Sequence, residues 1–279
     1  WISSNLDTVV LSFDGMADQQ NLHRPLRNGK PSFERVATSA LIFAQGDCEL
    51  VIRVCVSNRN VDHLPEIANW FAHTFHPSTI CFEPLSESEN SLRNNLCSPN
   101  PLTYAQKFYE ATRILEKVGI PTVLSTADLS TNQVTSCPVG KDTLIVSPDG
   151  TINACYLLEK QWQKAGLDMT IGKVSENDLQ IDLEALRRIR QFSVYQKTLC
   201  TDCFCRFHCA GGCHVHHDTH QPTGKYDDQC IRTRLVTAAL LLDQLGQKQL
   251  CEEWLGNERL TYQTAHQISD RLMIMDKTQ

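Results

Sequence analysis

The stretch LCTDCFCRFHCAGGC, residues 199–213, places five cysteines in fifteen positions. A thiolate is a soft ligand that suits zinc, copper(I) and iron-sulfur clusters. Cysteine can pack as a small apolar residue, but a core that needed only such side chains would use alanine or valine. The density of thiols therefore predicts a metal centre.

Further cysteines lie at ordered spacings around this stretch. The sequence reads C-x12-G-x4-C from Cys137 to Cys155, then C-x2-C-x5-C-x3-C from Cys200, then Cys230. This order resembles the SPASM domain, the C-terminal extension of many radical SAM enzymes, over about residues 130–240. The resemblance implies two auxiliary 4Fe-4S clusters. It assigns three cysteines to the first cluster (Cys137, Cys155, Cys213) and four to the second (Cys200, Cys203, Cys209, Cys230).

Two departures from the family pattern affect function. Some members supply a fourth ligand to the first cluster from a cysteine shortly after the first one, but none lies between Pro138 and Gly150. The first cluster is therefore expected to have an open iron site or a borrowed ligand, and Cys205 is the nearest unassigned thiol. Anaerobic sulfatase-maturating enzymes place an acid directly after the cysteine that matches Cys155. Here Tyr156 stands there, which disfavours that activity.

Other interpretations of the metal-binding residue types remain open. Two C-x2-C-like pairs can also build a structural zinc site. A histidine tract lies beside the cysteines (His208, His214, His216, His217, His220), and a solvated loop is its expected role. The remaining cysteines have no ligand spacing and are expected to pack as small apolar residues (Cys48, Cys55, Cys81, Cys97, Cys251).

The first part of the chain alternates between strand and helix patterns. Strands are predicted at 8–15, 49–58, 79–84 and 120–125, and helices at 32–45, 61–75 and 102–118. This alternation indicates parallel βαβ units and an α/β fold. The resemblance implies the C-terminal half of a partial (β/α)6 radical SAM barrel, strands four to six, over residues 1–129.

A small α+β SPASM domain is expected over residues 130–246, followed by a helical tail at 247–279. Pro148, Asp149 and Gly150 predict a hairpin turn. Helices are predicted near 182–192 and 229–246.

The predicted strands have one apolar face and one mixed face. If the apolar face packs on the helices, the other face carries Ser12, Asp14, Arg53 and Glu83. Resemblance implies that these four bind S-adenosyl-L-methionine (AdoMet), whose carboxylate matches the guanidinium of Arg53. The alternative is a structural ion pair of Arg53 with Glu83 or Asp14.

The sequence contains no C-x3-C-x2-C motif, which in radical SAM enzymes holds the third cluster, the one that cleaves AdoMet. The chain starts at Trp1 with a segment resembling strand four. We therefore expect a C-terminal fragment that is inactive alone.

The composition of the chain limits which binding partners and which cellular compartment are expected. With 26 Lys+Arg against 32 Asp+Glu, the net charge of -6 argues against nucleic acid. No membrane span or signal peptide is predicted. Thirteen cysteines, an odd number in a long chain, indicate a reducing cytoplasm.

The expected function is modification of a peptide or protein, as in ribosomal peptide maturases, with an electron donor such as a flavodoxin or ferredoxin. An open iron site on the first cluster would bind a substrate cysteine and favour thioether formation, and carbon-carbon cross-linking remains open. The alternative is a noncatalytic iron-sulfur protein for electron transfer or docking.

Overall fold

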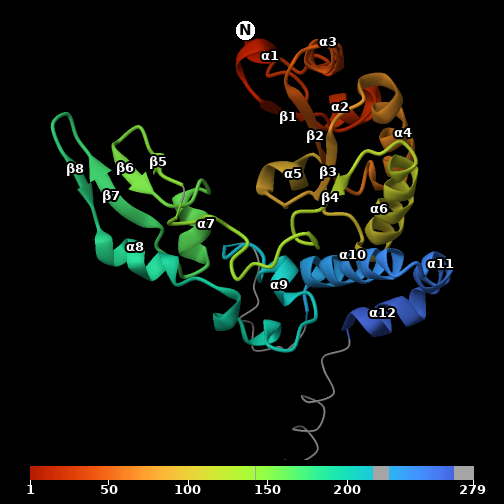
Figure 1. Ribbon diagram of the computed structural model, residues 1–279. Helices are drawn as coiled ribbons and strands as arrows, with labels where there is room; N and C mark the ends of the chain where they lie inside the picture. Colours follow the sequence, from red (N-terminus) through yellow and green to blue (C-terminus); the bar gives the residue numbers. More distant parts are fainter. Residues whose placement is uncertain (142, 216–225, 267–279) are drawn as a thin grey trace, which may run out of the picture. The chain divides into compact units, whose positions relative to one another are not determined.

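A computed structural model describes residues 1–141, 143–215 and 226–266 (Figure 1). The chain divides into two compact units. Of the described residues, the first unit contains 1–128 and 228–266, and the second contains the rest, within 129–227. In the described part of the chain, every helix is too short or too polar to cross a membrane.

A four-stranded parallel sheet forms the centre of the first unit. Its order is β1 (Thr8–Ser12), β2 (Glu49–Val56), β3 (Thr79–Pro84) and β4 (Thr122–Val123). The predicted α/β class with parallel strands is confirmed. β4 is shorter than the predicted strand at 120–125.

One face of this sheet is apolar and covered. Ile52, Val54 and Phe82 have no exposed surface, and Phe82 packs edge-on against Phe108 with 6.1 Å between ring centroids. The opposite face is open within this unit: Val10 is 60% exposed, and Arg53 is also exposed. Parallel sheets are usually covered on both faces, so the open face is the unusual feature of this unit.

The predicted helices between the strands are present. They are α3 (Phe33–Ala44), α4 (Leu64–Phe75) and α6 (Pro101–Glu116), and Figure 1 shows α4 and α6 side by side. The side chain of Asn100 caps α6 by accepting the backbone N–H groups of Leu102 and Thr103. Three short helices were not predicted: α1 (Ile2–Asn5), α2 (Ala17–His23) and α5 (Glu89–Arg93).

The C-terminal helices of the described chain also belong to the first unit. They are α10 (Asp228–Gln244), α11 (Lys248–Gly256) and α12 (Glu258–His266), and α10 packs against α6. The predicted helix at 229–246 is confirmed. Its assignment to a cluster-binding domain stays a prediction, because its packing partners lie in the unit of the parallel sheet.

The second unit contains an antiparallel sheet of consecutive strands. They are β5 (Ile145–Val146), β6 (Thr151–Asn153), β7 (Thr170–Val174) and β8 (Leu179–Ile181). The predicted hairpin is confirmed between β5 and β6. Gly150 in its turn has φ +82°, and an added Cβ would lie 2.2 Å from the carbonyl oxygen of Val174. Only glycine fits this position without strain.

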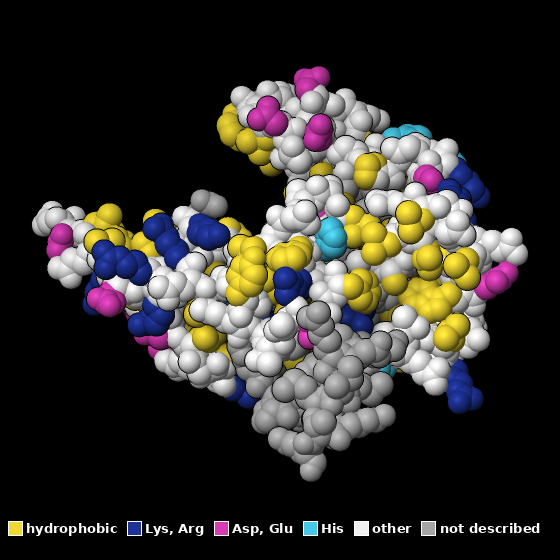
Figure 2. All heavy atoms as spheres, turned by 60° about the horizontal axis from the view of Figure 1, so that its bottom comes forward, with side chains coloured by type: hydrophobic (Ala, Val, Ile, Leu, Met, Phe, Trp, Pro, Cys, Tyr) yellow, Lys and Arg dark blue, Asp and Glu magenta, His cyan; other side chains and the backbone are white. Residues whose placement is uncertain are grey.

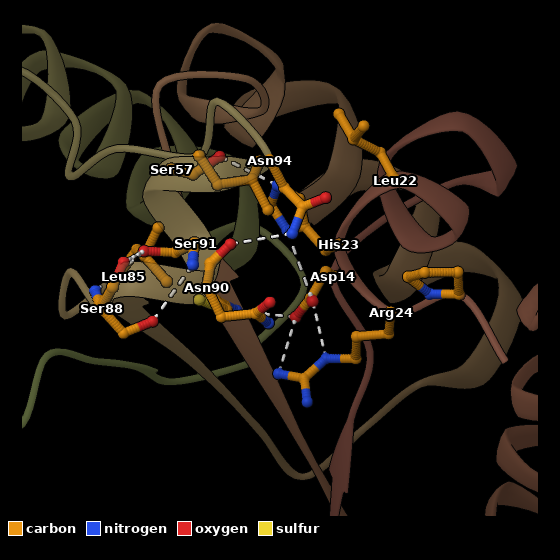
Figure 3. A pocket seen from close by; sticks show the side chains of 13 residues that line it. Asp14, Leu22, His23, Arg24, Ser57, Leu85, Ser88, Asn90, Ser91 and Asn94 are labelled. Carbon is orange, nitrogen blue, oxygen red and sulfur yellow. Dashed lines mark hydrogen bonds and ion pairs between the residues drawn. The ribbon is translucent and has the colours of Figure 1, made fainter. Parts of the chain in front are cut away.

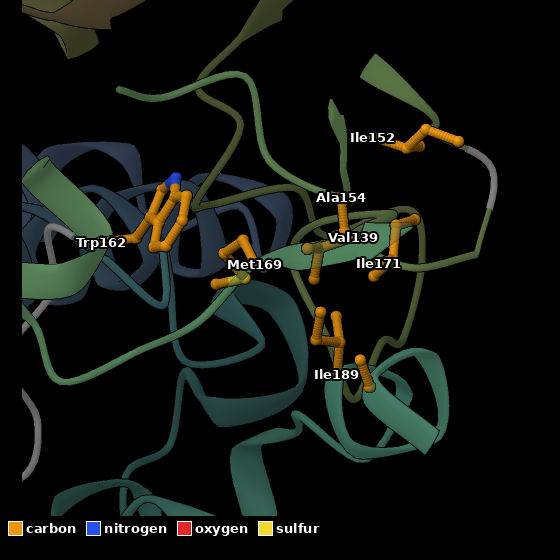
Figure 4. Packing of buried hydrophobic residues seen from close by; sticks show 8 residues of the cluster. Val139, Ile152, Ala154, Trp162, Met169, Ile171 and Ile189 are labelled. Carbon is orange, nitrogen blue, oxygen red and sulfur yellow. The ribbon is translucent and has the colours of Figure 1, made fainter. Parts of the chain in front are cut away.

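A compact apolar core supports this sheet (Figure 4). Trp162, Met169 and Ile171 are at most 2% exposed. Two helices complete the layer, the unpredicted α7 (Glu159–Lys164) and the predicted α8 (Leu183–Arg190). Cys137 and Cys155 pack against the core, which therefore fixes the positions of both thiols.

The remaining elements are short: η1 (Val61–His63) in the first unit, and η2 (Val194–Gln196), η3 (Thr198–Cys200) and α9 (Arg206–Cys209) in the second.

Candidate functional site

Three cysteines of the second unit form a first thiol group. Cys137 precedes β5, Cys155 follows β6, and Cys213 lies beyond α9. Burial raises the pKa of Cys155, and the nearby thiols of Cys213 and Cys137 raise it further. The pKa of Cys137 is raised by burial and by Cys213. Residues from three separate segments therefore bring their sulfur atoms into one neighbourhood.

A second thiol group comes from one continuous segment. Cys200 ends η3, Cys209 ends α9, and Cys203 lies between them. Burial raises the pKa of Cys209 to about 12, with a further contribution from Cys200 and Cys203. Burial and Cys203 raise the pKa of Cys200 to about 11. Such thiols stay protonated at neutral pH unless a metal ion stabilises the thiolate form.

The short loop Ala210–Gly212 joins the two groups. Its three residues all have positive φ, at +50°, +77° and +62°. The loop places Cys213 with Cys137 and Cys155, and Cys209 with Cys200 and Cys203. This is the grouping that the family resemblance implies, while the role of these thiols as cluster ligands stays a prediction.

The other candidate ligands are placed as follows. Cys230 lies on α10 in the first unit, and Cys205 is 1% exposed directly before α9. His214 packs its ring 5.0 Å from that of Phe192. His216, His217 and His220 lie outside the described residues.

The donor set fits an iron-sulfur cluster. Each group offers three thiols, and a cubane takes four thiolates. Among the described residues, no set of three or more His, Cys, Asp or Glu side chains is arranged to hold a metal ion. The thiol groups therefore fit a cluster through the chemistry of their sulfur donors.

A cavity of about 340 Å³ lies at the carboxyl ends of the parallel strands (Figure 3). Asp14 follows β1, Cys55 and Ser57 lie at the end of β2, and Leu85 follows β3. Ligands of open α/β sheets bind at this edge. The cavity is therefore the candidate small-molecule site of the first unit.

Asp14 is the central charged group of this cavity. Its carboxylate accepts hydrogen bonds from Arg24 Nε at 2.7 Å and from the backbone N–H of Cys55 at 2.8 Å. His23 Nδ1 lies 3.4 Å from Asp14 Oδ2, and its Nε2 lies 2.9 Å from Ser57 Oγ. Burial alone would raise the pKa of Asp14, but His23, Arg24 and the Cys55 N–H together lower it below the ordinary value. Asp14 is therefore an ionised anchor for both cavity side chains.

The described part of the structure does not contain the ion pair of Arg53 with Asp14 or Glu83 that was the alternative interpretation of these residues. Asp14 pairs with Arg24 rather than with Arg53, because α2 returns the chain to the end of β1. In the described chain, Arg53 makes no ion pair and lies exposed on the open face next to Ser12 in register. Glu83 accepts hydrogen bonds from Ser125 N and Oγ, both at 3.0 Å. Burial raises the pKa of Glu83.

Sequence reasoning missed His23 and Arg24. Both lie in the polar stretch HRPLRNG at 23–29, directly after the first strand and its turn. A cationic residue close behind a buried aspartate is the signal that would have found the pair, because a buried carboxylate requires a partner.

The surface charge is mixed. On the face seen in Figure 2, Lys and Arg side chains lie in small groups among hydrophobic and acidic ones, and no continuous basic stripe crosses the coloured atoms. This agrees with the net charge of -6.

Comparisons with known proteins support the cluster-binding interpretation. Residues 137–204 match the family model of the SPASM domain, an iron-sulfur cluster-binding domain. The predicted resemblance is thereby confirmed for the segment that carries Cys137, Cys155, Cys200 and Cys203. No curated protein matches the sequence.

Solved structures share the fold. Native anSMEcpe with bound AdoMet and the Kp18Cys peptide has a TM-score of 0.59 at 18% identity, over 85% of this chain and 68% of that chain. Native anSMEcpe with bound AdoMet has a TM-score of 0.60 at 18% identity, over 88% and 70%. The complex with AdoMet and the Cp18Cys peptide has a TM-score of 0.59 at 18% identity, over 87% and 70%. At this identity the likeness establishes the fold.

Proposed function

We propose that this chain serves a radical SAM/SPASM-type enzyme that modifies a peptide or protein, and that its second unit binds two auxiliary 4Fe-4S clusters. The observation that carries the proposal is the pair of thiol groups in a unit that matches an iron-sulfur cluster-binding domain. The parallel sheet is then the strand four to six half of a (β/α)6 barrel. Its shared fold with AdoMet-bound anSMEcpe supports this.

The cysteines would act as thiolate ligands. Cys200, Cys203 and Cys209, with Cys230 as the fourth, would hold the second cluster. Cys137, Cys155 and Cys213 would hold the first and leave one iron open. A substrate cysteine there would be oriented as a thiolate for thioether formation. Cys205 is the competing fourth ligand, and carbon-carbon cross-linking is the competing product.

The first unit would bind AdoMet at the carboxyl edge and open face of the sheet. Arg53 has a free guanidinium that fits the methionine carboxylate, and Ser12 lies beside it in register. Asp14 would orient Arg24 and His23 at the cavity wall, and Glu83 would complete the polar edge. When bound, AdoMet and the clusters would supply radical and electron-transfer chemistry.

The ligands of the AdoMet-cleaving cluster are not in this sequence, which has no C-x3-C-x2-C motif. We therefore propose that the chain alone does not cleave AdoMet. The same observation favours the second candidate, a noncatalytic iron-sulfur protein for electron transfer or docking.

The proposed partners follow from the chemistry. A peptide or protein is the substrate, which the peptide-bound anSMEcpe structures support. A flavodoxin or ferredoxin is the proposed electron donor. Thirteen cysteines, an odd number in a long chain, favour a cytoplasmic, reducing location.

Metal analysis of the anaerobically purified and reconstituted chain tests the proposal. We expect about eight irons and eight sulfides per chain. Cys97→Ala, outside both groups, should leave this content unchanged. Stoichiometric zinc without sulfide would contradict the cluster assignment.

A further inference from the structure

A buried lysine lies beside the second thiol group. Lys197 is 2% exposed and occupies the junction of η2 and η3. Its backbone carbonyl accepts the N–H of Cys200 at 2.9 Å. This bond fixes the lysine directly at the first cysteine of the group.

The side chain of Lys197 reaches the other end of the same group. Its Nζ donates hydrogen bonds to the carbonyl oxygens of Gly211 and Gly212, the latter at 3.4 Å. The N–H of Gly212 in turn donates to the carbonyl of Cys209 at 3.0 Å. The ammonium therefore lies on the loop that connects Cys209 to Cys213.

The contact is close along the whole side chain. A Cβ added to Gly211 would lie 2.8 Å from Lys197 Cδ, so the lysine stem packs directly on the glycine backbone. The side chain therefore spans from the segment that carries Cys200 to the loop that follows Cys209.

Burying an ammonium is costly unless dipoles or negative charge compensate for it. The two glycine carbonyls supply dipoles. A cubane with four thiolates is negatively charged, and it becomes more negative when it is reduced. An ammonium at this position stabilises the reduced state more than the oxidised state, because Coulomb attraction grows with the charge on the cluster.

We propose that Lys197 is an electrostatic positioning residue that raises the reduction potential of the cluster held by Cys200, Cys203 and Cys209. The proposal rests on the proposed function, since it needs that cluster. Net charge near a cluster is one of the factors that set its potential. Lys197 would thus favour the entry of electrons at this cluster.

The experiment isolates the second cluster. Cys213→Ala removes a ligand of the first cluster and serves as the background. In the reconstituted chain, Lys197→Met removes the charge at similar volume, Lys197→Arg keeps it, and Lys173→Met removes an exposed lysine of the same unit. Reduction is titrated anaerobically by electron paramagnetic resonance, together with iron and sulfide content.

At the background protein's midpoint potential, we expect Lys197→Met to lower the ratio of reduced to oxidised cluster on the order of tenfold. Lys173→Met and Lys197→Arg should stay near the background value. An unchanged midpoint in Lys197→Met with full iron content would overturn the proposal.

Loss of iron is also informative. If Lys197→Met loses the second cluster and Lys197→Arg keeps it, the charge serves to hold the cluster, and the proposed role in setting its potential is wrong. If Lys197→Arg loses it as well, the lysine acts by packing and the proposal is wrong. Absence of iron from the background and wild-type proteins would instead contradict the proposed function.

Discussion

Replacing Asp14 tests the buried charge network at the carboxyl edge of the parallel sheet. Its carboxylate is 1% exposed and accepts hydrogen bonds from Arg24 at 2.7 Å and from the Cys55 N–H at 2.8 Å. Asp14→Asn keeps an oxygen for the Cys55 N–H but removes the charge that faces Arg24. Hydrogen bonds to charged groups contribute about 1.5–3 kcal/mol each.

The exposure of Arg24 reduces the free-energy contribution of its hydrogen bond to Asp14. Its side chain is 42% exposed, so water recovers part of the lost interaction in the variant. We expect Asp14→Asn to lower the free energy of unfolding by about 2 kcal/mol. Asp14→Ala should cost about 4 kcal/mol, because it also leaves the Cys55 N–H buried without an acceptor.

Urea unfolding provides the assay. Trp70, one of four tryptophans in the chain, packs edge-on against Phe13 at 5.6 Å and contributes to the fluorescence signal. A loss of 2 kcal/mol moves the midpoint by about 1 M urea. Asp18→Asn, an exposed position on α2, is the matched control and should shift it little. A loss below about 0.5 kcal/mol in Asp14→Asn would refute the assigned network.

The pH dependence has a defined sign. The pKa of Asp14 is lowered in the folded protein, so its ionised form contributes stability above the unfolded value of 3.8. That contribution is lost as the pH falls through the lower folded pKa. The difference in stability between wild type and Asp14→Asn should therefore be constant near neutral pH and shrink in acid below about pH 4.

Three further predictions follow from the described contacts. Cys213→Ala should lower the iron content from about eight to about four per chain while the electron paramagnetic resonance signal of the second cluster persists. Cys209→Ala should remove the second cluster and leave the first. Loss of both clusters in either variant would contradict the division of the thiols into two groups. Gly150→Ala should destabilise the second unit by about 2 kcal/mol in thermal unfolding, since its Cβ would lie 2.2 Å from the Val174 carbonyl; an unchanged melting temperature would contradict the turn geometry. In an enzyme completed with the missing cluster motif, Arg53→Ala should weaken AdoMet binding about tenfold in equilibrium dialysis without changing auxiliary iron, whereas lost stability with normal binding would favour a structural role.

Local patterns predicted the parallel strands and their connecting helices. Alternation along 49–56 assigned Ile52 and Val54 to the buried face, and neither side chain has any exposed surface in the structure. The long helices carry enough turns for a periodic signal. β4 and β8 are only two and three residues long, too short for a periodic signal, and β4 also depends on pairing with the distant β3.

The cavity shows where sequence reasoning fails. Asp14 was expected on the mixed face of the sheet as a cofactor-binding residue, but the turn after β1 and helix α2 bring Arg24 back to it. A pair separated by ten residues leaves no periodic signal. The thiol grouping was implied by the family resemblance, because the first group joins three segments that local spacing does not connect, and its ligand roles stay predictions.

The backbone of Ala210 separates the thiols of Cys209 and Cys213. If α9 continued as a right-handed helix past Cys209, Cys213 would follow it by four residues and lie on the same face, so both sulfurs would point to one centre. Ala210 instead takes φ +50°, a conformation that costs a residue with a side chain roughly 1–2 kcal/mol. The backbone therefore changes from right-handed to left-handed between Cys209 and Cys213, and these closely spaced cysteines lie in two different thiol groups. An inserted or deleted residue in this loop would change the direction in which Cys213 leaves α9, so we expect this segment to tolerate length changes less well than ordinary surface loops do.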